Sequence, residues 1–255
     1  MNSDVNDILQ LPEKSLLQRR LTKVFFTKHF KLNATERRLL NNVIKSMQWL
    51  VSLKPATCNV ASSITDEYSF DEIQIFTVQL SDVDFDKYYK PVSEFIQRHV
   101  PYQILLILES ENQLAYSVAD KRINQSDKTK RTVESYYHTP IINTLYQRDI
   151  EKALDEAMQF RQLQKDNLAT VYQSYVSAIV QYQSACITGS YIARDHKRTV
   201  EDISVLKEIE STEAEMINIK SQLKKESQFN RKMEKNVELQ KKKNQIEELK
   251  AKLSQ

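Results

Sequence analysis

Two acidic side chains and an amide in the first half of the chain have the types and spacing best suited to catalysis. Glu72 and Gln74 alternate along a run typical of a β-strand, so both project from one face of that strand. Glu109 ends the next apolar run, which predicts a second strand. Clustered carboxylate oxygens hold the divalent ions of metal-dependent nucleases. The acid-x-lysine pattern of restriction-type nucleases is missing, however, because Gln74 follows Glu72 and Glu111 follows Glu109. A divergent nuclease is therefore the alternative to a purely structural role for these residues.

Other groups able to do chemistry are few and scattered. Metal binding needs several ligands that converge on one point, and no HxH or HExxH spacing occurs among the four histidines, His29, His99, His138 and His196. The single glycine, Gly189, excludes the loops of P-loop, dinucleotide-binding and kinase sites, each of which needs several glycines. We therefore expect no metal and no cofactor, and we favour a protein without catalytic activity.

Targeting and redox signals indicate a cytoplasmic protein. Cys58 and Cys186 lie far apart and belong to no CxxC pair, which is typical of buried thiols in a reducing compartment. The first five residues include an acid and no apolar core, unlike a signal peptide. The longest apolar run, residues 104–108, is the size of a strand and falls far short of a membrane span of about 20 residues.

A block near the C-terminus is the candidate binding site. Phe229 is a large aromatic among Lys, Glu, Asn and Gln, and Met233 and Val237 follow on the same helical face. An apolar side chain within a charged rim is typical of a protein interface. The alternative is that Phe229 folds back onto a helix over residues 149–188. The candidate partner-binding residues are Phe229, Asn230, Arg231, Lys232, Met233 and Asn236.

Charge is unevenly distributed along the chain, although the net charge is only +3. Residues 13–45 carry nine basic and two acidic side chains, and residues 220–255 carry eleven basic and five acidic ones. Basic segments bind nucleic acids or acidic partners, and they also form solvated helix faces. Direct DNA binding is thus a third interpretation.

The spacing of apolar residues changes along the chain between the period of a helix and that of a strand, which predicts the elements that position these residues. Apolar spacing predicts a helix over 35–50. The order of the predicted elements indicates a small mixed sheet with helices on one face. The unbroken apolar run of the second strand predicts a central position covered on both sides. The remaining predicted elements are strands over 71–80, 102–109, 114–119 and 132–137 and a helix over 84–99.

The sequence predicts that the C-terminal half is helical throughout. An apolar stripe from Ile150 to Ala185 predicts one helix over 149–188, and Gly189 sits where a left-handed C-cap belongs. A second long helix is predicted over 199–253, in which the apolar frame slips. The predicted fold is α+β, with a small N-terminal mixed sheet and packed helices followed by a long helical, coiled-coil-like C-terminal arm. The predicted units are an α/β domain over 1–140, a long amphipathic helix over 141–190 and a charged coiled-coil-like arm over 191–255.

Several sequence blocks resemble the bacterial family catalogued as domain of unknown function 4391. The most specific is the late block ESQFNRKM with its following asparagine. The blocks are residues 11–17, 49–60, 72–76, Pro101, and 226–233 with Asn236.

The resemblance implies a companion of DEAD/DEAH-type helicases and DNA methyltransferases in restriction or phage-defence gene clusters. The expected function is a non-catalytic accessory or adaptor subunit of such an assembly, docking a helicase or methyltransferase partner. A nuclease and a direct DNA-binding protein stay the alternatives. Self-association through the arm is also open.

Overall fold

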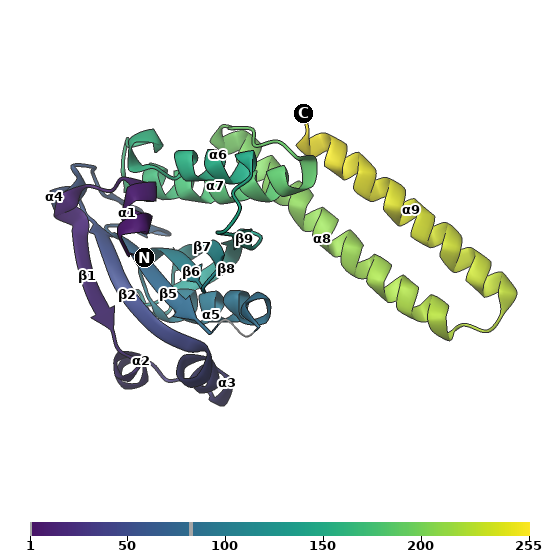
Figure 1. The fold of residues 1–255 in the computed structure, drawn as a ribbon, viewed down its shortest axis with the longest axis horizontal. Coiled ribbons are helices and arrows are strands. Elements are labelled where there is room, and N and C mark those ends of the chain that lie inside the picture. The colour runs from purple at the N-terminus through teal and green to yellow at the C-terminus, as the bar shows by residue number, and fades with distance from the viewer. Residues whose placement is uncertain (1, 82–83) are drawn as a thin grey trace.

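A computed structural model describes residues 2–81 and 84–255, with side chains from Val5 onward in those ranges. It is an α+β body with a mixed sheet, from which two long helices project (Figure 1). Among the strand pairs of the described residues only β5 and β6 are parallel, and α5 (Phe85–His99) lies between them in the sequence. A separate ribbon pairs β3 (Ser63–Ile64) with β4 (Ser69–Phe70). In order across the sheet the strands are β1 (Leu16–Leu21), β2 (Ile44–Leu53), β5 (Ile73–Leu80), β6 (Gln103–Glu109), β7 (Gln113–Ile123) and β8 (Arg131–His138), with β9 (Ile142–Asn143) paired to β7.

Helices cover both faces of the sheet, so the prediction of helices on one face is wrong (Figure 1). The helices α1 (Asn2–Leu9), α6 (Asp149–Ala157) and α7 (Leu168–Thr188) lie on one face, and α2 (Lys23–His29), α3 (Ala34–Arg38) and α5 on the other. The cause is that β5 and β6 carry apolar side chains on both faces of the sheet. Ile75 and Ile107 face α7, while Phe76 and Leu106 face α5. The predicted central position of the second strand, β6, is confirmed.

The predicted helix over 35–50 ends early. Asn33 caps α3, with its side chain accepting a hydrogen bond from the Glu36 N–H at 2.9 Å. A π-helical turn over Leu39–Val43 follows, and the chain then enters β2, which ends before α4 (Pro55–Cys58). A register shift between Trp49 and Val51 interrupts the strand alternation. A second shift lies between Ile44 and Ser46, and the buried side chains include Ile44, Met47, Leu50 and Leu53, whose spacing by three residues imitates a helix.

The predicted helix over 149–188 is interrupted. The chain forms α6, a 3-10 turn over Phe160–Gln162 and then α7, which Asn167 caps by accepting hydrogen bonds from the Ala169 and Thr170 N–H groups. The break contains Arg161 and Gln164, the two polar positions of the stripe. The predicted C-cap is confirmed, since Gly189 has φ of 85° and its N–H donates to the Ala185 carbonyl at 2.8 Å.

The predicted helix over 199–253 is two helices that run antiparallel as a hairpin (Figure 1). Helix α8 spans His196–Lys225 and α9 spans Phe229–Leu253. Glu226 closes the turn between them, because its carboxylate accepts hydrogen bonds from the Ser227 and Gln228 N–H groups at 2.9 and 3.0 Å. These bonds lower the pKa of Glu226. At about 1.5 Å per residue, α8 is about 45 Å long.

Candidate functional site

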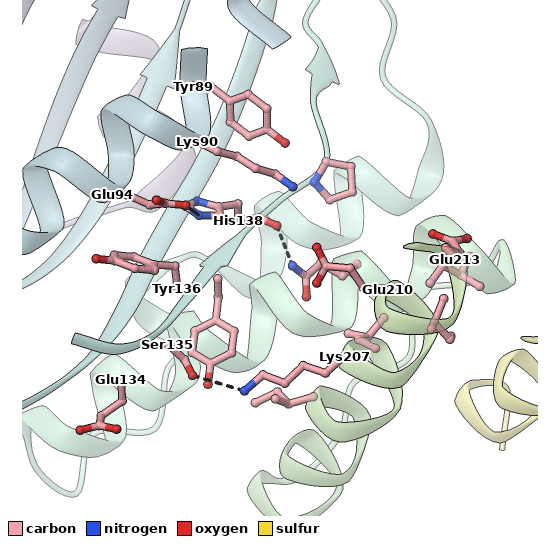
Figure 2. Close-up of a pocket in the computed structure, with 17 residues that line it drawn as sticks. Tyr89, Lys90, Glu94, Glu134, Ser135, Tyr136, His138, Lys207, Glu210 and Glu213 are labelled. Atoms are coloured by element: carbon pink, nitrogen blue, oxygen red, sulfur yellow. Dashed lines mark hydrogen bonds and ion pairs between the residues drawn. The ribbon is translucent and has the colours of Figure 1, made fainter. Parts of the chain in front are cut away.

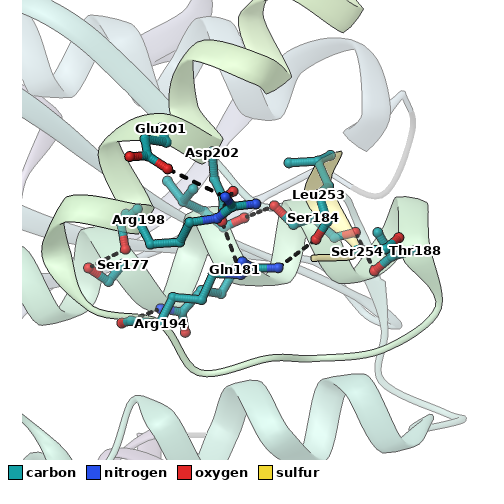
Figure 3. Close-up of polar contacts among 12 residues, drawn as sticks. Ser177, Gln181, Ser184, Thr188, Arg194, Arg198, Glu201, Asp202, Leu253 and Ser254 are labelled. Atoms are coloured by element: carbon teal, nitrogen blue, oxygen red, sulfur yellow. Dashed lines mark hydrogen bonds and ion pairs between the residues drawn. The ribbon is translucent and has the colours of Figure 1, made fainter. Parts of the chain in front are cut away.

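A buried ionic cluster holds the root of the hairpin (Figure 3). The Asp202 side chain is fully buried, and its two oxygens each lie 3.2 Å from an arginine Nε, one from Arg194 and one from Arg198. Burial raises the pKa of Asp202, and the two guanidinium groups oppose that effect. Arg194 is itself buried, and its backbone carbonyl accepts a hydrogen bond from Gln181 of α7 at 3.1 Å.

The same two arginines cap the end of α9. Arg194 Nη2 donates to the Leu253 carbonyl and Arg198 Nη2 to the Lys252 carbonyl, each at 2.5 Å. The last carbonyls of a helix lack partners within it and favour positive charge. Beside this cap, Leu253 packs in a small apolar cluster with Ile209 of α8 and Ile187 of α7. The cluster and the cap together fix both ends of the hairpin to the body.

On α9, the side that faces α8 becomes partly polar toward the tip. Lysine side chains of α9 occupy positions at which a packed helix pair would have apolar residues. Farther out than the apolar cluster, three polar contacts cross the hairpin: Gln245–Glu208 at 3.0 Å, Lys242–Glu215 at 2.5 Å and Lys235–Gln222. Ile219 of α8 is nevertheless buried, so the distal half of the hairpin combines apolar packing with these polar contacts.

Three apolar residues of the distal part of α9 point outward. Phe229, Met233 and Val237 are 74%, 51% and 53% exposed. They are spaced by four residues and so share one face of α9, and we call these three side chains the tip stripe. Ile217 of α8 is also exposed in the distal half. Phe229 lies at the end of the hairpin remote from α7, so it does not fold back onto the predicted helix over 149–188 (Figure 1).

The structure brings the six candidate partner-binding residues together in the first turns of α9. The polar members are all exposed: Asn230, Arg231, Lys232 and Asn236. Sequence reasoning missed Ile217, for which the available signal was an apolar residue next to Met216 but off the stripe that faces α9. It also missed the root cluster, whose signal is the spacing of Arg194, Arg198 and Asp202 by four residues.

Of the three candidate nuclease residues, Glu72 and Gln74 contact each other, but Glu109 lies far from both. Glu72 is buried, and its carboxylate accepts hydrogen bonds from Ser52 Oγ at 2.6 Å and Gln74 Nε2 at 3.1 Å and pairs with Lys54 at 3.2 Å. Glu109 lies at the opposite end of the parallel pair, six residues beyond the partner of Ile73, or about 20 Å along the strand. In residues 2–81 and 84–255, no three His, Cys, Asp or Glu side chains are grouped to hold a metal ion.

None of the helices within the described ranges has both the length and the apolar character that crossing a membrane requires.

Comparisons with known proteins place the chain in a family. No curated protein and no solved structure matches the chain. The family model described as domain of unknown function (DUF4391) matches residues 9–246, nearly the whole sequence. The chain therefore belongs to the DUF4391 family.

Proposed function

We propose that the chain is a non-catalytic adaptor that binds a partner protein through the tip of the α8–α9 hairpin. The observation that carries this proposal is the tip stripe, in which Phe229, Met233 and Val237 are exposed while Lys235 and Lys242 contact α8. An exposed apolar stripe on a charged helix favours association, because burying it releases water from apolar surface.

The occupant that fits best is an amphipathic helix with acidic flanks. The tip stripe repeats every four residues, which matches the apolar face of a second helix. Arg231 and Lys232 stand beside it and would pair with carboxylates of the partner at the rim of the interface. Following the family resemblance, we propose that this helix belongs to a helicase or DNA methyltransferase of a restriction or phage-defence assembly.

The root of the hairpin supports an adaptor role mechanically. Asp202, Arg194 and Arg198 tie both ends of the hairpin to the body, so the tip is held at a set distance from the sheet. A fixed spacing lets one chain hold a partner on the arm at a defined position relative to the body.

Co-expression with any helicase or DNA methyltransferase that a neighbouring gene encodes tests the proposal. We expect the wild-type chain to co-purify with one of them and a Phe229→Ala, Met233→Ala double variant to bind it at least about 30-fold more weakly. Val200→Ala is the matched control, because it also shortens an exposed apolar side chain, but one that lies on α8 near the root of the hairpin. Equal capture by the double variant and the control would overturn the assignment of the tip.

A second proposal, direct DNA binding, is favoured by the N-terminal basic segment. Of the nine Lys and Arg side chains in residues 13–45, all but Lys23 are exposed. Glu36, one of the two acids in that segment, is buried and already paired with Arg98 at 3.2 Å and His99 at 3.1 Å. If this surface binds DNA, the affinity for a duplex probe falls steeply with salt and falls further in Arg19→Gln, Arg20→Gln. Absence of binding at low salt would remove this proposal.

A further inference from the structure

A cleft separates the edge of the sheet from the root of the hairpin (Figure 2). Its volume is about 720 Å³, and its walls come from α5, β8, α7 and α8. Volumes of this size are typical of binding sites for small molecules and peptide segments. The cleft lies near the root of the hairpin, so any ligand here is separate from one bound at the tip stripe.

The free edge of β8 forms one wall of the cleft. In the part of the chain that the structure describes, strand β8 is the last strand of the sheet and pairs only with β7. The Thr139 N–H donates to the Tyr116 carbonyl of β7 at 2.9 Å, so by alternation the backbone groups of Tyr136 and His138 turn away from β7. The His138 carbonyl accepts a hydrogen bond from Gln183 Nε2 at 2.7 Å, which shows that a polar group fits against this edge. Such an edge can accept an additional strand.

The His138 imidazole points into the cleft without a hydrogen-bond partner (Figure 2). Its side chain is only 9% exposed, and neither ring nitrogen has a partner among the residues that the structure describes. The ring stacks on Tyr136, with ring centres 6.2 Å apart, and meets Tyr89 edge-on. Burial, and secondarily Lys90, lowers the pKa of His138 to about 4, so at neutral pH the ring offers one donor and one acceptor. Buried polar groups are normally paired, so the two His138 nitrogens are candidate contacts for a ligand in the cleft.

The side chains that line the cleft carry a surplus of negative charge, which favours a cationic ligand. Four carboxylates line it against two lysines, Lys90 and Lys207, in a protein whose overall charge is positive. Glu94 Oε1 lies 3.9 Å from His138 Nε2, and Figure 2 shows Glu210 of α8 facing the same space from the opposite wall. A surplus of carboxylates attracts cationic side chains and repels the phosphates of nucleic acids.

We propose that this cleft binds an extended basic segment of a partner protein, which adds as a strand to the free edge of β8 and places lysine or arginine side chains against Glu94 and Glu210. The backbone of the segment pairs with the backbone groups of Tyr136 and with the His138 N–H, because Gln183 holds the His138 carbonyl, and a polar side chain hydrogen-bonds the His138 ring. Lys207 of α8 already shows the fit of one lysine, because its Nζ reaches Ser135 Oγ across the cleft at 3.3 Å. This proposal does not depend on the tip stripe.

Fluorescence anisotropy with the full chain and three short labelled peptides tests the proposal. The first peptide alternates lysine and threonine, the second replaces lysine with glutamate, and the third replaces threonine with proline, which removes backbone donors but keeps the charge. We expect the lysine–threonine peptide to bind most tightly, the proline peptide at least about tenfold more weakly, and the glutamate peptide not at all. Equal binding of the lysine peptides with threonine and with proline would overturn strand addition, and binding of the glutamate peptide would overturn the charge argument.

Variants locate the binding. Glu94→Gln, Glu210→Gln should weaken the lysine–threonine peptide about tenfold, whereas the matched control Glu248→Gln, an exposed carboxylate on α9 outside the cleft, should not. The ring signals of His138 in NMR spectra should shift when the peptide is added. Unchanged His138 signals with full binding, or equal effects of the variant pair and the control, would place the peptide elsewhere and refute the proposal. Phe229→Ala, Met233→Ala should leave this affinity intact, so its outcome separates the cleft from the tip.

Discussion

Replacing Asp202 by alanine should release the hairpin from the body. Asp202 is fully buried between Arg194, which is also buried, and Arg198, which is partly exposed. Removing one partner from a buried ionic cluster costs about 3–5 kcal/mol, because the opposite charge loses its compensation. Water reaches Arg198, and both arginines keep their bonds to the carbonyls of α9. We therefore expect a loss near the lower limit, about 3 kcal/mol.

The melting temperature and local hydrogen exchange measure this loss. For a chain of this size about 3 kcal/mol corresponds to a drop in Tm of about 6–12 °C if the whole protein unfolds together. If only the hairpin detaches, the amides at the end of α9 exchange faster while those of β5 and β6 are unchanged. Glu201→Ala is the matched control, because Glu201 is exposed and contacts the same Arg198 at 3.4 Å. That pair should contribute less than about 1 kcal/mol. Equal, small effects of the two variants on both readouts would refute the reasoning.

Three further predictions concern the body, the hairpin interior and the cleft. Val171→Asp should destabilise the protein by about 2–5 kcal/mol, since Val171 of α7 is fully buried against the sheet, and an unchanged melting temperature would contradict this packing. Lys242→Leu should be neutral or stabilise the hairpin by about 1 kcal/mol, because Glu215, its partner, is exposed and keeps its hydration; chemical denaturation measures the change. His138 has a pKa of about 4 in the folded protein against about 6.5 unfolded, so the unfolded chain binds more protons between those values. Its contribution is complete above pH 6.5 and falls by about 3 kcal/mol as pH falls to 4, and urea titrations of wild type and His138→Phe should diverge in that window.

The central elements of the body could be predicted from local patterns. Strands β5 and β6 and helix α5 each carry an uninterrupted period, and their predicted bounds agree closely with the structure. Strand β2 could not be predicted in this way, because the register shift after Trp49 erases its alternation. The break before α7 was marked only by Arg161 and Gln164, two polar positions in an otherwise apolar stripe.

The two candidate sites differ in how well they could be predicted from the sequence. The tip block is contiguous, so its unusual composition was visible around Phe229 without a structure. The cleft joins Glu94, His138 and Glu210 from three elements far apart in the chain, and no local pattern links them. The same holds for the contact of Arg194 with the end of α9, which depends on the hairpin turning back at Glu226.

Hydrogen exchange of the complex tests the adaptor claim most directly. With a helicase or methyltransferase partner bound, the account predicts slower exchange of amides in residues 229–239, which the free chain exposes at the tip. The amides of β5 and β6 should exchange as they do in the free protein. Protection confined to the body, with residues 229–239 exchanging as fast in the complex as in the free chain, would contradict the claim that the hairpin tip binds the partner.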